Sequence, residues 1–329
     1  MTKQDASVII PNWNGLEFIK NCLNSLKTQT FKTFEIIVVD NGSTDGSVDF
    51  IKKNYPYIII IELKKNTGFA FAVNRGIEKS RGEYVILLNN DTEVDKFCIG
   101  KLVEIAKKYP QVSFIAAKIL NYYKRNILDS TGDYIDEVGH ADNIGRGEKD
   151  SKKYSIAGPI FLATAGGCLI KKEAFKKVGL LDEDYFMYFE DVDWCFRAQL
   201  LGLKGWYEPK AIIYHINKAS ANRIKPFVEY LQFRNMTMTI LKDFPKGLIL
   251  QRMNWLRIFW VNINTVRYFA TQSYLWEAIK AEYYILTNLR KILKKRSIIQ
   301  KSKVVSDKYI IENIRRRKLT LFGIFKKGI

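Results

Sequence analysis

Short apolar runs alternate with amphipathic segments through the first 95 residues, and this alternation restricts the fold more than any other feature of the chain. The predicted elements are strands at 7–11, 34–40, 58–63 and 84–89, and helices at 16–29, 47–53 and 69–80. Such an alternation builds a parallel sheet, whose strands have their carboxyl ends at one edge. Polar turns follow two of these strands, at Asp40-Asn41-Gly42-Ser43 and Asn89-Asn90-Asp91-Thr92. We therefore predict an α/β domain whose first half binds a nucleotide.

Regular structure continues after residue 95 and becomes wholly helical near the end. The expected elements are a helix over 95–109, a strand over 114–120, loops or short hairpins over 121–155, a strand over 164–171, a helix from about residue 191 and a strand over 211–216. After Pro226 the pattern is helical to the end, with breaks near Pro245 and Lys303. We place a boundary near residue 244, which separates a domain of 1–244 from a helical region of 245–329.

Positive charge is concentrated in the last quarter of the 329-residue chain. Residues 1–244 carry 34 basic and 30 acidic side chains, net +4, whereas 245–329 carry 19 and 4, net +15. Basic segments bind nucleic acid, anionic lipid or acidic glycans. In this region the charges are interspersed with aromatic residues, at Trp255, Phe259, Trp260, Tyr268, Phe269, Tyr274 and Trp276. That mixture favours an anionic membrane surface, and we expect no nucleic-acid partner.

The cysteines and the N-terminus indicate a cytoplasmic protein. The four cysteines form neither a C-x-x-C pair nor a dense disulfide framework. The first residues lack the apolar core of a secretory signal. The longest uncharged run among the C-terminal aromatic residues, 258–266, is far shorter than the roughly 20 residues that cross a bilayer. We expect a protein that lies peripherally on the inner face of the cell membrane.

Small and polar residues near the strand ends suit contacts with a nucleotide or sugar. Gly15 allows a close turn after the first strand, and a carboxylate at Asp40 can accept hydrogen bonds from a ribose or a pyrimidine. The same residues also suit structural tasks, such as capping a turn or a helix. The candidate residues for binding a nucleotide or sugar are Pro11, Trp13, Asn14, Asp40, Asn41, Asn66, Gly68, Asn74, Asn89, Gly166 and Gly167.

A second set of residues suits a divalent cation. Asp91 follows the apolar run 85–88, and hard cations take oxygen ligands from one or two carboxylates, from phosphates and from water. His215 follows the apolar run 211–214, and neutral imidazole is a common metal ligand. A capped turn at Asp91 and a structural role for His215 are the alternatives. Asp91 is our candidate ligand for a divalent cation, and His215 becomes one only in the company of further ligands.

Taken in order, these segments resemble family 2 glycosyltransferases of the GT-A fold, near the bacterial rhamnosyltransferase-like branch. The resemblance runs from about Ser7 to Asn235. It implies a Rossmann-like mixed α/β sheet flanked by helices, which in this chain carries a basic helical C-terminal extension. Asn89-Asn90-Asp91 corresponds to the family's D-x-D metal motif, with Asn89 in place of the first aspartate.

The same resemblance implies roles for two later segments. Phe189-Glu190-Asp191-Val192-Asp193-Trp194 is similar to the acidic motif whose second acid deprotonates the acceptor, which makes Asp191 the general base and Glu190 its neighbour. On its own, an acid cluster at a helix start is usually structural. Tyr214-His215 and Ser220 are similar to a segment whose histidine completes the metal or diphosphate site. Residues 230–235 resemble a Tyr-and-Arg-Asn segment of the non-processive branch, to which the sequence assigns no role.

The expected function is inverting, non-processive transfer of a sugar from a UDP- or dTDP-linked donor. The acceptor would be a hydroxyl of a glycan or lipid-linked saccharide in bacterial surface polysaccharide synthesis. The Gln-x-x-Arg-Trp motif of processive members is missing after the acidic motif. A nicotinamide oxidoreductase lacks support because no G-x-G-x-x-G opens the first helix, and no Gly-rich phosphate loop indicates a pyrophosphorylase. The remaining alternative is a non-catalytic carbohydrate- or nucleic-acid-binding scaffold.

Overall fold

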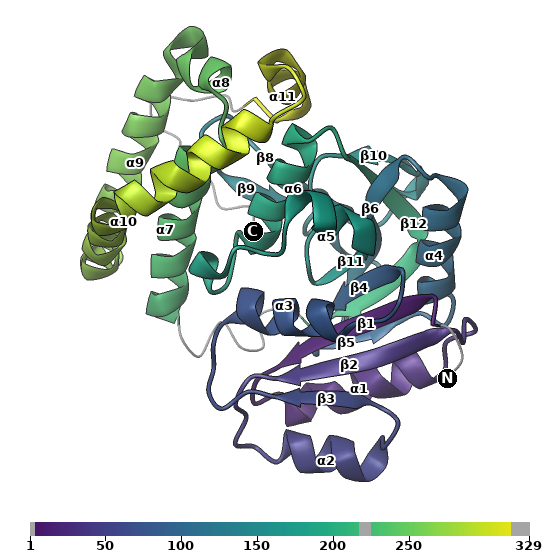
Figure 1. The fold of residues 1–329 in the computed structure, drawn as a ribbon. Coiled ribbons are helices and arrows are strands. Elements are labelled where there is room, and N and C mark those ends of the chain that lie inside the picture. Colours follow the sequence, from purple (N-terminus) through teal and green to yellow (C-terminus); the bar gives the residue numbers. More distant parts are fainter. Residues whose placement is uncertain (1–3, 217–224, 317–329) are drawn as a thin grey trace.

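A central twisted sheet with helices on both faces forms the body of the protein, and a bundle of C-terminal helices packs against one end of it (Figure 1). The computed structural model describes residues 4–216 and 225–316. Ser220 and the predicted helix beyond residue 316 lie outside these described residues. Within them, no helix combines the length and the apolar composition needed to cross a membrane.

The helices and strands follow one another along the chain with short connections. The strands are β1 Ala6–Asn12, β2 Phe34–Asp40, β3 Ile59–Glu62, β4 Tyr84–Leu88, β5 Thr92–Val94, β6 Val112–Asn121, β7 Leu128–Ser130, β8 Asp133–Ile135, β9 Ala141–Asn143, β10 Gly158–Ile160, β11 Gly167–Lys171 and β12 Lys204–His215. The helices are α1 Leu16–Lys27, α2 Ser47–Asn54, α3 Phe69–Lys79, α4 Cys98–Lys108, α5 Lys172–Val178, α6 Glu190–Leu200, α7 Lys225–Asp243, α8 Lys246–Leu250, α9 Asn254–Thr271, α10 Leu275–Ser302 and α11 Asp307–Asn313, with 3-10 turns η1 Lys152–Ser155, η2 Glu183–Tyr185 and η4 Gln251–Met253.

The main sheet is mixed, and its strand order is β10-β12-β6-β11-β4-β1-β2-β3. Strands β4, β1, β2 and β3 are mutually parallel, so their carboxyl ends meet at one edge. Strand β11 runs antiparallel between β4 and β6. Its first residue, Gly167, pairs with Leu88, and this register brings the turn before β11 to the carboxyl end of β4. The site described below is built at that edge.

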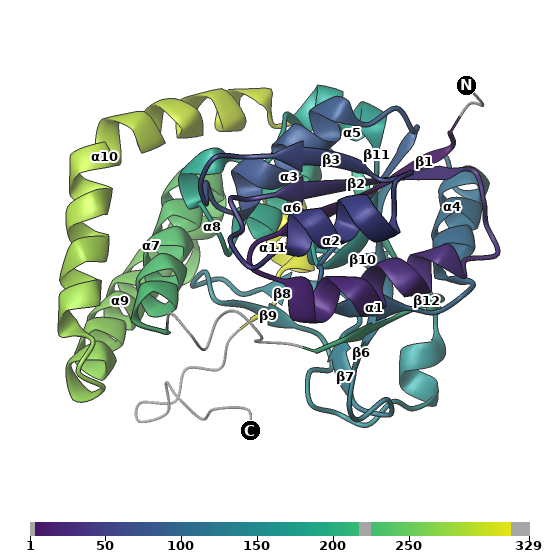
Figure 2. The same ribbon diagram turned by 90° about the horizontal axis from the view of Figure 1, so that it is seen from below.

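Alternation along the strands divides the core into two layers. Val8 and Ile10 of β1 face a layer shared with α1, α2 and α4, whereas Ile9 faces a layer shared with α3, α5 and α6. Figures 1 and 2 show these two groups of helices on opposite faces of the sheet. Because both faces are covered, the central strands are apolar throughout, which is why the runs 36–39 and 85–88 were recognisable from the sequence.

The structure confirms the predicted alternation of strands and helices and extends it. The strand expected over 211–216 begins seven residues earlier, at Lys204, because a register shift between Glu208 and Ile212 accommodates the segment that includes Pro209. Two elements that we did not predict, β5 and α5, are only three and seven residues long. Such short elements are positioned by their neighbours and carry little pattern of their own.

The C-terminal helices share their core with the sheet domain. Phe244, Leu248, Ile310 and Ile314 belong to the same buried cluster as residues of β1 and β4. The long helix α10 lies along α7, and α11 reaches the α6 side of the sheet, where Tyr309 Oη donates to Gln199 Oε1 at 2.7 Å (Figure 1). The predicted boundary near residue 244 therefore falls in a link between helices that are packed on the same body.

Candidate functional site

A buried asparagine joins three strand ends at the carboxyl edge of the parallel strands. Asn12, at the end of β1, donates from Nδ2 to Asp40 Oδ1 at 3.1 Å and to Ser47 Oγ at 2.9 Å. Its Oδ1 accepts from Asn90 Nδ2 at 2.8 Å. Gly15 lies so close that a Cβ there would overlap both amides. The sequence indicates the strand-end segment that contains Asn12 as nucleotide-binding, but Asn12 itself was not among our candidate residues.

Two further asparagines shape the turns that flank this edge. Asn14 has φ of 47°, a conformation that asparagine tolerates, and its Oδ1 accepts from the backbone N–H of Thr44 at 2.8 Å. Asn41 accepts from Thr67 N–H at 2.8 Å and donates to the Gly68 carbonyl oxygen at 3.1 Å. Asn66 accepts from Gly68 N–H at 3.0 Å. The predicted donor-side residues thus form one connected set of turns.

Asp40 is held in place by the turn that follows it. It is buried, and its Oδ2 accepts from the backbone N–H of Ser43 at 2.9 Å while Oδ1 accepts from Asn12. This is the turn-capping arrangement that we had weighed as the structural alternative. Capping leaves the second lone pair of each carboxylate oxygen for a ligand, so the geometry is compatible with either role.

Asp91 and His215, which we predicted as metal ligands from separate segments, lie side by side. The turn after β4 carries Asp91, and β12 ends at His215. Asp91 Oδ1 is 3.2 Å from His215 Nε2, and His215 Nδ1 is 2.7 Å from Asp129 Oδ2. Asp129, in β7, was missed by sequence reasoning because nothing along the chain indicates that β7 reaches His215. A carboxylate on the second ring nitrogen is the usual way in which proteins orient a metal-binding histidine.

The electrostatics of this triad suit a cation. Burial alone would lower the pKa of His215, but hydrogen bonds to Asp129 and Asp91 outweigh burial and raise it to about 10. A proton on His215 therefore offsets one of the two carboxylate charges, and a cation bound at Nε2 would take the place of that proton. Within residues 4–216 and 225–316, no group of three or more His, Cys, Asp or Glu side chains is arranged to hold a metal ion. The donor set of one carboxylate and one imidazole fits a Mg2+ or Mn2+ ion that takes its other ligands from phosphate and water.

Glu190 and Asp191 begin α6 in two different environments. Asp191 accepts from the backbone N–H groups of Ala165 at 2.9 Å and Val192 at 2.8 Å. Burial raises the pKa of Asp191, and these hydrogen bonds oppose the rise. Glu190 is buried, its Oε2 has no hydrogen-bond partner, and burial together with Asp191 raises its pKa well above the usual value. An oriented carboxylate with a raised pKa is suited to accept a proton.

One turn connects the acids of α6 with the end of β4. Ala165 donates to Asp191, and the carbonyl oxygen of the next residue, Gly166, accepts from the backbone N–H of Asn89 at 3.4 Å. A Cβ on Gly166 would lie 3.0 Å from Asn89 Nδ2. Asp133 is buried near Asp191, and burial together with the charge of Asp191 raises the pKa of Asp133 to about 8. The two acidic sites are therefore neighbours at one edge of the sheet.

Some predicted residues have visible structural tasks. Both polar atoms of Asn74 are occupied, since Nδ2 donates to the Leu181 carbonyl oxygen at 2.9 Å and Oδ1 accepts from Leu181 N–H. Gly167 leaves room for Ile213, whose Cδ1 would be 2.8 Å from a Cβ. Pro11 pairs with Val39 inside β1, and Trp13 follows that strand, half-buried. Ligand contacts by these four residues remain predictions.

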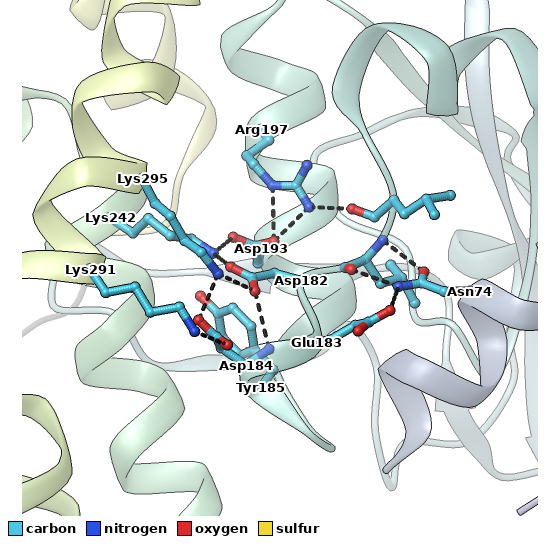
Figure 3. Close-up of polar contacts among 12 residues, drawn as sticks. Asn74, Asp182, Glu183, Asp184, Tyr185, Asp193, Arg197, Lys242, Lys291 and Lys295 are labelled. Carbon is cyan, nitrogen blue, oxygen red and sulfur yellow. Dashed lines mark hydrogen bonds and ion pairs between the residues drawn. The ribbon is translucent and has the colours of Figure 1, made fainter. Parts of the chain in front are cut away.

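The third acid of the motif is not part of this site. Asp193 is fully buried and pairs with Arg197 Nη2 at 2.8 Å and with Lys242. Asp182, which precedes η2, and Asp184, which lies within it, pair with Lys242, Lys291 and Lys295 (Figure 3). These acids tie α6 and η2 to α7 and α10.

Comparison with known proteins gives a consistent family. The model of "Glycosyl transferase family 2" matches residues 7–179. The chain is 29% identical over 211 residues to a poly-beta-1,6-N-acetyl-D-glucosamine synthase of Staphylococcus epidermidis, which covers 63% of this chain and 49% of that protein. It is 43% identical over 91 residues to the uncharacterized glycosyltransferase YibD of Escherichia coli, covering 27% and 26%. The chain thus spans about half the length, or less, of these relatives.

Solved structures agree on the fold. GalNAc-T7 in complex with UDP, GalNAc and Mn2+ superposes with a TM-score of 0.57 at 16% identity, covering 72% of this chain and 47% of that one. A mannosyltransferase of Pyrobaculum calidifontis, PcManGT, in complex with GDP-Man and Mn2+, superposes with a TM-score of 0.53 at 15% identity, covering 95% and 86%. The expected GT-A fold is confirmed. With more than half of its residues matched by the family model, this chain belongs to glycosyl transferase family 2.

Proposed function

We propose that this protein is an inverting, non-processive glycosyltransferase that moves a sugar from a UDP- or dTDP-linked donor to a hydroxyl of a glycan or lipid-linked saccharide. The observation that carries the proposal is the proximity of two acidic sites at one sheet edge. The Asp91–His215 pair suits a donor diphosphate with its cation, and the Glu190–Asp191 pair suits the hydroxyl that attacks. The rhamnosyltransferase-like branch is part of the same proposal.

The proposed division of labour follows from the charges and hydrogen bonds of these residues. The strand-end turns around Asn12, Asp40 and Asn41 bind and orient the nucleotide. Asp91 and His215 would hold a divalent cation, which neutralises charge on the departing diphosphate. Asp191, oriented by Ala165 and Val192, accepts the proton of the acceptor hydroxyl as the new glycosidic bond forms on the opposite face of the sugar. The raised pKa of Glu190 keeps a second negative charge away from Asp191.

The relatives support a more specific setting. The staphylococcal relative is named as a polysaccharide synthase, and both solved neighbours hold a nucleotide or nucleotide sugar with Mn2+. We therefore place the reaction in bacterial surface polysaccharide synthesis, with Mg2+ or Mn2+ as cofactor. Because the chain spans about half of its staphylococcal relative, the acceptor and the product belong to the proposal.

A panel of nucleotide sugars tests this function. Wild-type protein with Mn2+ or Mg2+ should release nucleotide from at least one UDP- or dTDP-sugar, faster with a matching saccharide acceptor. Asp91→Asn should lose this activity, whereas Asp49→Asn, which changes an exposed carboxylate on α2, should keep it. Binding of a saccharide without turnover of any donor would support the non-catalytic scaffold instead.

The proposal includes attachment to an anionic membrane surface on the cytoplasmic side. Helices α9 and α10 lie at the end of the molecule away from α4 (Figures 1 and 2). Trp255 and Phe259 of α9 and Trp276 of α10 are 50–62% exposed. On α10, exposed apolar residues recur at helical spacing, at Trp276, Ile279, Tyr283, Leu286 and Leu293. Exposed cations lie on the same helix, at Lys280, Arg290 and Lys294, as is typical of interfacial helices.

Vesicle binding tests the membrane part. The triple variant Trp255→Ser, Phe259→Ser, Trp276→Ser should sediment less with phosphatidylglycerol-containing vesicles, and the loss should be clearest at low salt. Tyr123→Ser, which removes an aromatic side chain that is 73% exposed on another part of the protein, is the control. Equal sedimentation of the triple variant and the control would refute membrane attachment through α9 and α10. Substitutions are preferable to truncation near residue 244, because α10 covers buried acids.

A further inference from the structure

The segment between η2 and α6 holds its backbone in an unusual conformation. Phe186, Tyr188 and Phe189 all have positive φ, at 64°, 68° and 69°. Residues with a Cβ rarely adopt this region because it brings the Cβ close to the backbone, so other contacts must compensate in the folded protein. The segment leads directly into Glu190 and Asp191. Its conformation therefore determines where these two carboxylates lie.

Two buried residues of α7 hold this segment through hydrogen bonds to its backbone carbonyl groups. Asn235 is fully buried, and its Nδ2 lies 3.0 Å from the Tyr185 carbonyl oxygen, 2.9 Å from that of Met187 and 2.7 Å from that of Tyr188. Arg234 donates from Nη2 to the carbonyl oxygens of Asp184 and Tyr185 at 2.9 and 2.8 Å. Three carbonyl groups of this short segment thus converge on one side-chain amide.

The orientation of the Asn235 amide is fixed by Arg234. Arg234 Nε donates to Asn235 Oδ1 at 2.8 Å. A guanidinium has no acceptor, so Oδ1 must face Arg234, and the Nδ2 group must face the carbonyl groups. Arg234 itself lies over the rings of Tyr230 and Tyr284, at 5.3 and 4.6 Å. The Tyr-and-Arg-Asn segment, to which the sequence assigned no role, is thus assembled around one loop.

The 186–189 segment also contacts the turns on the proposed nucleotide side of the site. The Phe186 carbonyl oxygen accepts from the backbone N–H of Ala70 at 3.2 Å, in the first turn of α3. A Cβ on Gly68 would lie 2.6 Å from the ring and from the carbonyl oxygen of Phe186. The same segment therefore packs at one end on the turn at Gly68, which Asn41 holds by hydrogen bonds, and leads at the other end into Glu190 and Asp191 of α6.

Helix α10 contacts both η2, which precedes this segment, and the end of α7. Lys295 pairs with Asp182 at 2.6 Å and with Asp184 at 2.7 Å, on both sides of the start of η2 (Figure 3). Arg296 donates to the carbonyl oxygens of Leu241 and Phe244 at the end of α7, at 2.9 and 2.8 Å. Helix α10 thus helps to hold both the start of η2 and α7, the helix that carries Arg234 and Asn235.

We propose that Asn235, oriented by Arg234, is a positioning residue that holds the 186–189 segment in its left-handed conformation and so places Glu190 and Asp191 against the acceptor. The catalytic consequence rests on the proposed glycosyl transfer, whereas the hydrogen bonds between Asn235 and this segment are a property of the fold. This arrangement makes α7 and α10 part of the structure that positions the two acids.

The test compares Asn235→Ala with Gln232→Ala, which removes an exposed amide from the same helix. Amide hydrogen exchange should rise in residues 185–191 of Asn235→Ala and stay unchanged there in Gln232→Ala, under conditions where both variants are folded. In turnover assays, kcat of Asn235→Ala should fall by about 10²-fold, the cost typical of a misplaced reacting group, whereas the nucleotide Kd should change less than about threefold.

The two readouts separate two kinds of failure. If amide hydrogen exchange over residues 185–191 of Asn235→Ala were as slow as in the wild type, the claim that Asn235 holds this segment would be wrong, whatever the activity. Faster exchange with an unchanged kcat would overturn the positioning role. If the wild-type protein turned over no donor, the proposed function would fail, and hydrogen exchange would still decide whether Asn235 holds the segment. Should Asn235→Ala not fold, Asn235→Ser, which keeps one donor, replaces it in both measurements.

Discussion

Two acidic regions lie within a few residues of each other in this protein, and they differ in the partners of their carboxylates. Around the strand ends, Asp91 meets the imidazole of His215, and Asp191 meets backbone N–H groups and the side chain of Thr164. Around η2, Asp182, Asp184 and Asp193 meet lysine or arginine (Figure 3). The first region leaves negative charge for a cation or a proton, whereas the second is neutralised within the protein.

The pKa values follow the same division. Burial raises the pKa of Asp191. Burial also disfavours the charged form of Asp182, but Lys242 and Lys295 outweigh it and hold the pKa of Asp182 well below its usual range. The motif Glu190-Asp191-Val192-Asp193 contains both kinds of acid, because successive helix positions face different neighbours. An acid cluster in a sequence thus acquires a role only from the partners that the fold supplies.

Replacement of Asp191 gives the sharpest test of this contrast. Asp191→Asn should lower kcat by about 10²–10⁴-fold, the usual contribution of a general base, in assays of nucleotide release with acceptor present. Stability should change little, because one hydrogen bond to a backbone N–H is lost, at about 1 kcal/mol, while a buried charge is removed. Near-normal turnover, or unfolding at ordinary temperature, would assign Asp191 to the structural region instead.

Lys242→Met tests the other region and should show the opposite pattern. Lys242 is buried and pairs with Asp182 and Asp193. Its loss removes one of the two cations that each of these carboxylates contacts, and breaking a buried ion pair typically costs about 3–5 kcal/mol. Urea unfolding should record this loss. Lys280→Met removes an exposed lysine from α10 and should have no measurable effect on stability. A Lys242→Met variant as stable as the wild type would show that these acids do not depend on lysine for their charge.

The sequence predicted much of the fold because burial on both sides of a parallel sheet leaves a local pattern. The predicted strand over 34–40 has the observed bounds of β2. Helix α3 was recognised from spacing alone, and its end differs from the prediction by one residue. Strand β5 escaped prediction because its three residues derive their conformation from pairing with β12, a neighbour more than a hundred positions away.

Site residues at strand ends were predictable, whereas their partners were not. Asp91 and His215 were candidates because each follows an apolar run, and the antiparallel pairing of β12 with β5, the strand that directly follows Asp91, sets them side by side. Asp129 and Asn235 act through contacts that cross 86 positions and about 50 positions of sequence, respectively. Asp129 has no local pattern, and the segment that contains Asn235 was recognisable without a role, because the role of each residue depends on the group that the fold places opposite it.

Asp129 offers a test of intermediate size at the boundary between the two kinds of acid. It contacts His215 Nδ1 at 2.7 Å and so fixes the orientation of the ring. Asp129→Ala should weaken Mn2+ binding by about 10–100-fold, as expected for the loss of a carboxylate behind a metal-binding histidine, measured as free Mn2+ by electron paramagnetic resonance. Asp142→Ala, in the neighbouring β9, is the control. Equal Mn2+ affinity in both variants would make Asp129 a structural partner of His215 only.

Lys291→Met should have the smallest effect and shows where the lysine-paired region becomes ordinary surface. Lys291 is 53% exposed and pairs with Asp184 at 2.6 Å, a contact that Lys295 partly duplicates. Burial opposes ionisation of Asp184, but these two lysines outweigh it and lower its pKa.

The stability supplied by this pair is therefore present above the ordinary pKa of an aspartate, about 3.9, and is lost as the pH falls through the lower pKa of folded Asp184. Lys291→Met should cost less than about 1 kcal/mol at pH 7 and low salt. The difference from the wild type should shrink in 1 M salt and vanish in acid, when Asp184 is protonated in both proteins. A difference in urea unfolding that persists at low pH would mean that Lys291 stabilises α10 by packing rather than by charge.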